Sequence, residues 1–194
     1  MSKIIEVEKC LKRNNGYITT NELINIGITK PYINKLISNG IIEKVCHGIY
    51  ANSKIIVDEY YVLQMKYNNI VYSHNTALYF LNLTNRAPME IDITTPRDKR
   101  VRGNYNIHRV SNKIYNIGII EVIDPYGNPI KIYNAERCIC DILRNEILDI
   151  EQRNRVLDYY FKSKNKDVDR LLEYAKKFKI YDKVNTIMGV MLRW

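Results

Sequence analysis

The sequence predicts an α+β protein of two domains, and three features of its 194 residues lead to that prediction. Near the N-terminus, two short helical patterns separated by a glycine precede two short strand patterns. From about residue 90 to residue 133 strand patterns alternate with turn residues, and helical patterns fill the remainder. The polar run at residues 51–54 is the best candidate boundary. We therefore expect one domain over residues 1–53 and a larger mixed domain over residues 54–194, with a small antiparallel sheet and a helical C-terminal half.

Capping signals define two helices in the first domain. One should begin at Thr19, because T-x-x-E, ending at Glu22, is a capping box in which hydroxyl and carboxylate each bind a backbone N–H. Gly27 ends this helix, since glycine tolerates the left-handed conformation. Thr29 can cap the next helix, with Pro31 in its first turn.

The helix after Thr29 has an apolar side and a polar side. At 100° per residue Ile33 and Leu36 share one face, and the polar residues fall on the other. A strand, a basic tip and a returning strand follow up to Tyr50. With a helix expected at residues 2–14, this order is that of a winged helix-turn-helix, although an ordinary helical hairpin with a solvated face remains the alternative. The predicted DNA contacts are Thr29, Lys30, Tyr32, Asn34, Lys35, Ser38, Lys44 and His47.

Composition favours a polyanionic partner. The net charge is +9 and the pI is near 9.3, which suggests nucleic acid but also fits a merely basic protein. The sequence shows no signal peptide and no run of about 18 apolar residues, so we expect a cytoplasmic protein without membrane contact. The four cysteines lack C-x-x-C spacing. We predict no cofactor and no metal site.

Strand and helix patterns alternate in the second domain. Residues 55–66 are helical or mixed, residues 70–72 form a short strand, and Ser73 can cap a helix that runs to Leu83. Residues 90–95 alternate like a strand with Ile91 and Ile93 inward and Asp92 and Thr94 outward. Further strands are expected at residues 105–110, 118–123 and 129–133, and helices at residues 135–143, 149–162 and 167–178, followed by a last helix.

Two motifs in this domain could carry chemistry. Ser73 precedes His74, but neighbours in sequence seldom reach catalytic geometry and no G-x-S-x-G surrounds them, so a helix cap with a hydrogen-bonded histidine is preferred. Arg137 and Asp141 stand at i, i+4, the spacing of an ion pair on a structural helix. The sequence contains no Walker loop, dinucleotide fingerprint or HExxH, and we predict no enzyme. The motif residues are Ser73, His74, Thr76, Glu136, Arg137, Asp141 and Arg144.

Basic residues also cluster after the strand at residues 90–95. The default interpretation is a solvated loop, and the alternative is a contact surface for a partner. The residues are Arg97, Lys99, Arg100 and Arg102, with Arg109 nearby.

Taken together, these segments resemble the AbiEi-like antitoxins of the AbiE type IV toxin–antitoxin systems, which act in abortive infection. The resemblance rests on V-C-H-G-I-Y at residues 45–50, Y-S-H-N-T-A-L at residues 72–78, I-D-I-T-T-P at residues 91–96 and E-R-C-I-C-D-I-L-R at residues 136–144.

The resemblance implies that the first domain binds inverted repeats of double-stranded operator DNA and represses its own operon. The second domain would counteract a nucleotidyltransferase-like toxin without forming a stable complex. We expect a monomer in solution, with more than one copy on each operator. In the alternative, the second domain is an RNA- or protein-binding module that acts on the toxin's substrate.

Overall fold

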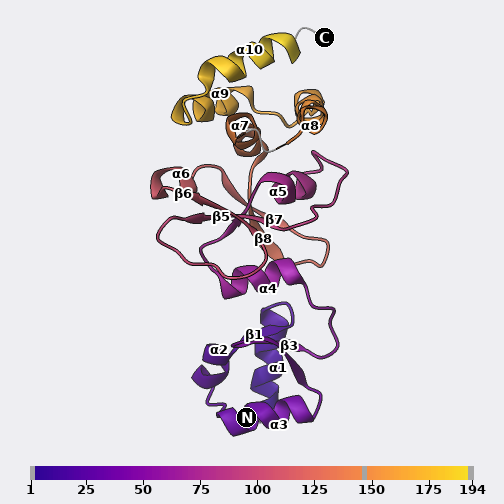
Figure 1. The fold of residues 1–194 in the computed structure, drawn as a ribbon. Helices are drawn as coiled ribbons and strands as arrows, with labels where there is room; N and C mark the ends of the chain where they lie inside the picture. The colour runs from indigo at the N-terminus through magenta and orange to yellow at the C-terminus, as the bar shows by residue number, and fades with distance from the viewer. Residues whose placement is uncertain (1–2, 146–147, 192–194) are drawn as a thin grey trace. The chain divides into compact units, whose positions relative to one another are not determined.

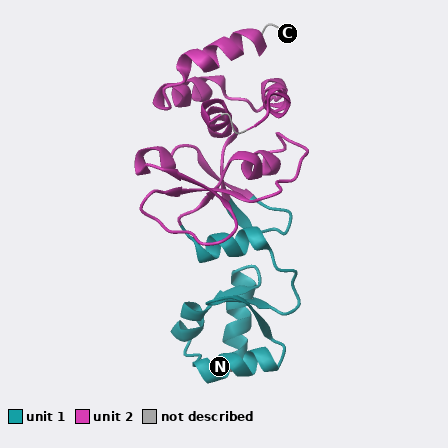
Figure 2. Cartoon of the chain, viewed as in Figure 1, with its two compact units in different colours: residues 1–68, 123–130 teal, residues 69–122, 131–194 magenta. Residues whose placement is uncertain are grey.

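The computed structural model describes residues 3–145 and 148–191. The chain divides into two compact units, shown in Figure 2. Unit 1 comprises residues 1–68 and 123–130, and unit 2 comprises residues 69–122 and 131–194. Among the described residues, none of the helices has the length and apolarity needed to cross a membrane.

Helices surround a small antiparallel sheet in unit 1 (Figure 1). Strand β3 lies between β1 and β2, and it pairs antiparallel with both. Residue 2, expected in the first helix, lies outside the described residues. The elements are α1 (Lys3–Arg13), β1 (Tyr17–Thr19), α2 (Thr20–Asn25), α3 (Lys30–Ser38), β2 (Ile42–Cys46), β3 (Ile49–Asn52) and α4 (Glu59–Lys66).

The apolar faces predicted for these helices meet in one core. Leu23 of α2 and Leu36 of α3 are buried there with Val7 of α1. The capping box of α2 is present, since the Thr19 side chain accepts from the Glu22 N–H and the Glu22 carboxylate accepts from the Thr19 N–H. Thr29 is the N-cap residue of α3, but its side chain forms no capping hydrogen bond.

Helix α4 packs within unit 1, against the face of the sheet opposite that core. Val62 of α4 is buried with Tyr17, Ile49 and Ala51 of the sheet. Asp58 caps α4 by accepting from two backbone N–H groups of its first turn. Unit 1 therefore continues past residue 53, and the functional boundary between residues 53 and 54 stays a prediction.

A mixed sheet forms the first part of unit 2. Its strand order is β6-β5-β4-β8-β7. The expected antiparallel pairing is found between β4 and β5, whereas β5 with β6 and β4 with β8 are parallel. The elements are β4 (Val71–Tyr72), α5 (His74–Phe80), β5 (Asp92–Pro96), β6 (Asn106–Val110), α6 (Asn112–Tyr115), β7 (Ile119–Ile123) and β8 (Pro129–Tyr133).

Strand β5 differs from its predicted pattern. Asp92 and Thr94, expected to face solvent, are 2% and 1% exposed, as deeply buried as Ile93. The prediction was wrong because β5 is an inner strand, and α5 covers the face that carries Asp92. Helix α5 also ends at Phe80 rather than Leu83, since Asn82 has a positive φ of 55°.

Helices make up the rest of unit 2, as expected. Helix α7 contacts α5, α8, α9 and α10 and is buried along most of its length (Figure 1). Asn134 precedes α7, and its side-chain oxygen accepts from the Arg137 N–H. The helices are α7 (Ala135–Asn145), α8 (Ile150–Lys162), α9 (Val168–Lys177) and α10 (Tyr181–Met191).

Candidate functional site

Helix α3 presents the polar face that its sequence predicts. Ile33 and Leu36 are buried, while Asn34, Lys35 and Ser38 are exposed. Thr29 and Lys30 are exposed at the N-terminal end of the helix. Cationic and short polar side chains therefore cover the side of α3 that faces away from the core of unit 1.

The β2–β3 turn and α3 border one hollow. Lys44 and His47 of this hairpin are exposed, and the Thr20 N–H donates to Gly48 O at 2.9 Å, which ties the turn to the start of α2. A cavity of about 650 Å³ lies between the hairpin and α3. Its lining includes four predicted DNA contacts, Lys30, Asn34, Lys44 and His47, together with Thr19, Thr20 and Lys66.

Four predicted DNA contacts do not line this hollow. The Tyr32 ring packs partly against the core, and Lys3 Nζ lies 5.7 Å from its centroid. Ser38 Oγ donates a hydrogen bond to Lys35 O at 3.1 Å. Lys66, which the sequence did not single out, joins the hollow because the α4 helix ends there. The four residues are Thr29, Tyr32, Lys35 and Ser38.

Arg137 is the most deeply buried charge of unit 2, with a side chain 0% exposed. Its Nε lies 2.8 Å from Asp141 Oδ2, the expected i, i+4 ion pair. Nη1 donates to the carbonyls of Ile114 and Ile117. The guanidinium lies 4.1 Å from the Tyr133 ring centroid. Burial raises the pKa of Asp141, and the adjacent Arg137 guanidinium opposes that rise.

The neighbours of Arg137 in the motif also have structural contacts. Glu136 Oε1 accepts from Tyr160 OH at 3.1 Å and from the Asp167 N–H at 3.2 Å, which joins α7 to the start of α9. The Arg144 guanidinium is exposed at the end of α7 and lies 5.8 Å from the Phe178 ring centroid. The motif thus holds helices together.

The Ser73–Thr76 run is organised around Asp92. Ser73 is fully buried, and its Oγ lies 3.0 Å from His74 Nδ1. The Ser73 N–H donates to Asp92 O, and the Asp92 N–H donates to Thr76 Oγ1 at 2.8 Å. Burial lowers the pKa of His74 well below its usual range, and His108 and Arg137 add to that effect. The Ser73 hydroxyl is closed to solvent in this structure.

The sequence did not identify Asp92 or His108 as site residues. Both face His74 in the structure, with His108 Nε2 at 2.9 Å from Asp92 Oδ1. They lie 18 and 34 positions after His74, and no local spacing connects residues so far apart. The sequence feature that could have pointed to Asp92 was its position as an aspartate inside an otherwise apolar and threonine-rich strand.

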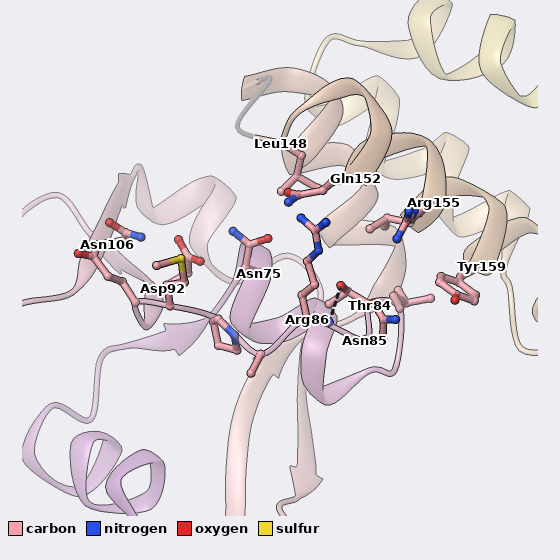
Figure 3. A pocket seen from close by; sticks show the side chains of 16 residues that line it. Asn75, Thr84, Asn85, Arg86, Asp92, Asn106, Leu148, Gln152, Arg155 and Tyr159 are labelled. Carbon is pink, nitrogen blue, oxygen red and sulfur yellow. Dashed lines mark hydrogen bonds between the residues drawn. The ribbon is translucent and has the colours of Figure 1, made fainter.

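A cavity of about 550 Å³ opens beside this polar group (Figure 3). Asn75 and Asp92 line it from α5 and β5, and Gln152 and Arg155 line it from α8. Arg86, in the segment between α5 and β5, extends toward Gln152 in Figure 3.

The basic loop between β5 and β6 is exposed at the residues that the sequence predicted. Lys99 Nζ lies 3.4 Å from Asp98 Oδ2 in a surface pair, which contributes little to stability. Exposure fits both the solvated-loop interpretation and the partner surface. The loop residues are Arg97, Lys99, Arg100 and Arg102, and Arg109 is exposed on strand β6.

Comparison with known proteins supports the resemblance seen in the sequence. Residues 6–53 match a family described as transcriptional regulator, AbiEi antitoxin. No curated protein matches the chain. The crystal structure of the RV2827C protein from Mycobacterium tuberculosis is similar over 97% of this chain and 81% of its own, with a TM-score of 0.52 and 14% identity, a likeness of fold. Residues 6–53 are thus similar to a family of AbiEi antitoxins described as transcriptional regulators.

Proposed function

We propose that this AbiEi-like chain is an antitoxin and transcriptional autorepressor that binds inverted repeats in the promoter of a type IV toxin–antitoxin operon. The observation that carries the proposal is the hollow of unit 1, where α3 and the β2–β3 hairpin bring Lys30, Asn34, Lys44 and His47 together. In the winged helix-turn-helix interpretation, α3 is the recognition helix and the β2–β3 hairpin is the wing.

Roles follow from side-chain chemistry. Asn34, Lys35 and Ser38 project from the exposed face of α3, where they can reach base edges in the major groove. Lys30, Lys44 and His47 flank that face and suit contacts with phosphates, and each lysine that meets a phosphate displaces a condensed counterion. Thr29 and Tyr32 lie at the start of α3 and contact phosphates or flanking bases. Inverted repeats imply more than one copy of the chain on each operator.

The antitoxin activity is assigned to unit 2, which counteracts a nucleotidyltransferase-like toxin without a stable complex. The exposed loop with Arg97, Lys99 and Arg100 is the surface proposed for it, because several cations project there from a short connection between two strands. An exposed basic loop also suits a contact with RNA. The alternative proposal is therefore that unit 2 binds the toxin's substrate and not the toxin.

Operator binding provides the test. The full chain is titrated against a labelled promoter fragment, by anisotropy, at several salt concentrations. Lys44→Ala and Lys35→Ala should each weaken binding, and each should reduce the slope of log K against log salt by about one where the lysine meets a phosphate. Lys164→Ala, an exposed lysine of unit 2, removes the same charge and should leave the slope unchanged. Equal affinities and slopes for all four proteins would exclude the α3–wing surface.

A second arm separates the two activities. The variant Arg97→Gln/Lys99→Gln/Arg100→Gln should retain operator binding and lose rescue of cells that express the toxin. Lys44→Ala should show the reverse pattern. Loss of both activities in the loop variant, or of neither, would contradict the division of labour between the units.

A further inference from the structure

Three potential metal ligands meet in unit 2. His74, Asp92 and His108 each offer one ligand atom, and these atoms all lie within 4.8 Å of one another. Two of the three histidines in the chain take part. The side chains of His74 and Asp92 are buried and that of His108 is 23% exposed, so this is not a cluster of solvated surface groups.

Strand register explains why distant residues meet. In the parallel pair of β5 and β6, Asp92 lies opposite Asn106 and Thr94 lies opposite His108. Side chains two residues apart share a face, so Asp92 and His108 project from the same side of the sheet. Helix α5 begins at His74 above that face, where the Ser73 N–H donates to Asp92 O at 3.1 Å.

The three side chains are in close contact. His108 Nε2 lies 2.9 Å from Asp92 Oδ1, and the His74 and His108 rings stack with centroids 3.6 Å apart and planes at 28°. The stack brings both imidazoles to the carboxylate of Asp92.

Two buried atoms of the group lack a partner. Among residues 3–145 and 148–191, no hydrogen-bond partner is found for His74 Nε2 or Asp92 Oδ2. Leaving a buried polar atom unsatisfied costs about 1–3 kcal/mol, and such atoms in folded proteins call for a missing water, ion or ligand. Both atoms belong to the same three-residue group, so a single bound species can satisfy them.

His74 is prepared to act as a ligand. Ser73 Oγ meets its Nδ1 at 3.0 Å, which leaves Nε2 as the ring nitrogen for a metal and gives the outer contact that orients ligand histidines. The φ of His74 is +46°, a left-handed conformation that costs energy in a residue other than glycine and often marks a functional site.

We propose that His74, Asp92 and His108 bind a divalent transition-metal ion, with Zn²⁺ as the best match to this donor set. Two imidazoles and a carboxylate are ligands that Zn²⁺ takes at about 2.0–2.2 Å. Ligand atoms around a tetrahedral ion stand roughly 3.3 Å apart, so the separations within the group, all below 4.8 Å, need to shorten by at most about 1.5 Å. A hydrogen-bonded His–Asp pair beside a neutral histidine, with no affinity for metal, is the competing explanation.

A neighbouring cavity borders the group at Asp92. Asp92 belongs to the lining of the cavity of about 550 Å³, together with Asn75 and Asn106, as Figure 3 shows. Metal sites that keep a position for water or a ligand typically use three protein ligands. The ion would therefore stand at the edge of that cavity, with its fourth position toward it.

Metal titration of the full chain tests this proposal independently of DNA binding. The chain is stripped with a chelator, and Zn²⁺ is then titrated against a chromophoric competitor. One equivalent should bind per chain, and His108→Gln and Asp92→Asn should each weaken binding by more than about 10–100-fold, the loss usual for an outer contact alone. Ser73→Ala, which removes only the outer contact, should fall within that range. Circular dichroism in chelator verifies that each variant is folded.

The unit 1 residues Cys46 and His47 provide matched controls. They are adjacent, His47 is exposed, and cysteine and histidine are both common zinc ligands, so they test whether zinc binds elsewhere on the chain. His47→Gln and Cys46→Ser should retain the full affinity. The proposal would be overturned if the wild-type chain bound no Zn²⁺, or if folded His108→Gln and Asp92→Asn bound it as tightly as the wild type. Loss of Zn²⁺ affinity in His47→Gln would also overturn it.

Discussion

At the scale of single residues, Arg137 is a buried cation that depends on the groups around it. A buried guanidinium depends on groups that match its donors and its charge. Here Asp141 accepts from Nε, two backbone carbonyls accept from Nη1 and two aromatic rings lie against the guanidinium, whereas Nη2 has no hydrogen-bond partner among the described residues. Gly118 makes the approach of the loop before β7 feasible: a Cβ at this position would lie 2.7 Å from Arg137 Cβ, and its φ is +82°. The arginine is therefore a structural centre of unit 2.

Removal of this arginine should be costly. Arg137→Met leaves Asp141 as an uncompensated buried carboxylate, so we expect the free energy of unfolding to drop by about 3–5 kcal/mol. Urea unfolding followed by circular dichroism measures it. The matched control is Lys162→Ala, which breaks the exposed i, i+4 pair with Asp158 and should cost at most about 0.5 kcal/mol. Equal losses in both variants would contradict the structural role of Arg137.

At the scale of elements, the two threonine caps of unit 1 are not equivalent. Thr19 takes part in a complete capping box with Glu22, whereas the Thr29 side chain makes no capping hydrogen bond. From the sequence, both residues were predicted to be N-caps. The structure separates them, because only Thr19 turns its hydroxyl toward the first turn of the helix.

Stability measurements should show that difference. Thr19→Ala should lower the free energy of unfolding by about 0.5–2 kcal/mol, the usual value of an N-cap, and Thr29→Ala by less. Thr29→Ala should nevertheless weaken operator binding in the proposed function, since its exposed hydroxyl lies at the start of α3. A Thr29→Ala variant as destabilised as Thr19→Ala would show that Thr29 caps α3 in solution.

At the scale of the whole molecule, buried titratable groups act in opposite directions. Burial, assisted by the neighbouring Asp124, raises the pKa of Asp58 from 3.8 to about 6. Between pH 4 and pH 6 the folded chain keeps a proton that the unfolded chain has released, so stability decreases as pH rises through this window. His74 acts oppositely: its pKa is lowered, so stability decreases as pH falls below the unfolded value of about 6.5.

Asp58→Asn isolates the first effect. Asparagine is also a good N-cap, so α4 keeps its cap while the titrating proton is removed. Relative to the wild type, the variant should gain stability as pH rises from 4 to 6 and then hold that gain. Urea unfolding in chelator at each pH measures it, with Asp149→Asn at the exposed cap of α8 as the matched control. If the difference in the free energy of unfolding between Asp58→Asn and the wild type did not change with pH, that result would contradict the raised pKa of Asp58.

The sequence by itself determined the features that depend on residues three or four positions apart. The capping box at Thr19, the buried and exposed faces of α3 and the Arg137–Asp141 pair all follow from helical spacing, so they could be predicted from the order of residues alone. The resemblance to AbiEi antitoxins, now supported over residues 6–53, rests on similar short motifs.

Only the tertiary structure decided which distant residues meet. The parallel pairing of β5 with β6 buried Asp92 and brought His108 beside it, and α5 added His74 from another part of the chain. In unit 1, the end of α4 likewise brought Lys66 to the hollow beside α3. Strand order, register and helix packing set these contacts, so they could not be predicted from the spacing of residues along the chain.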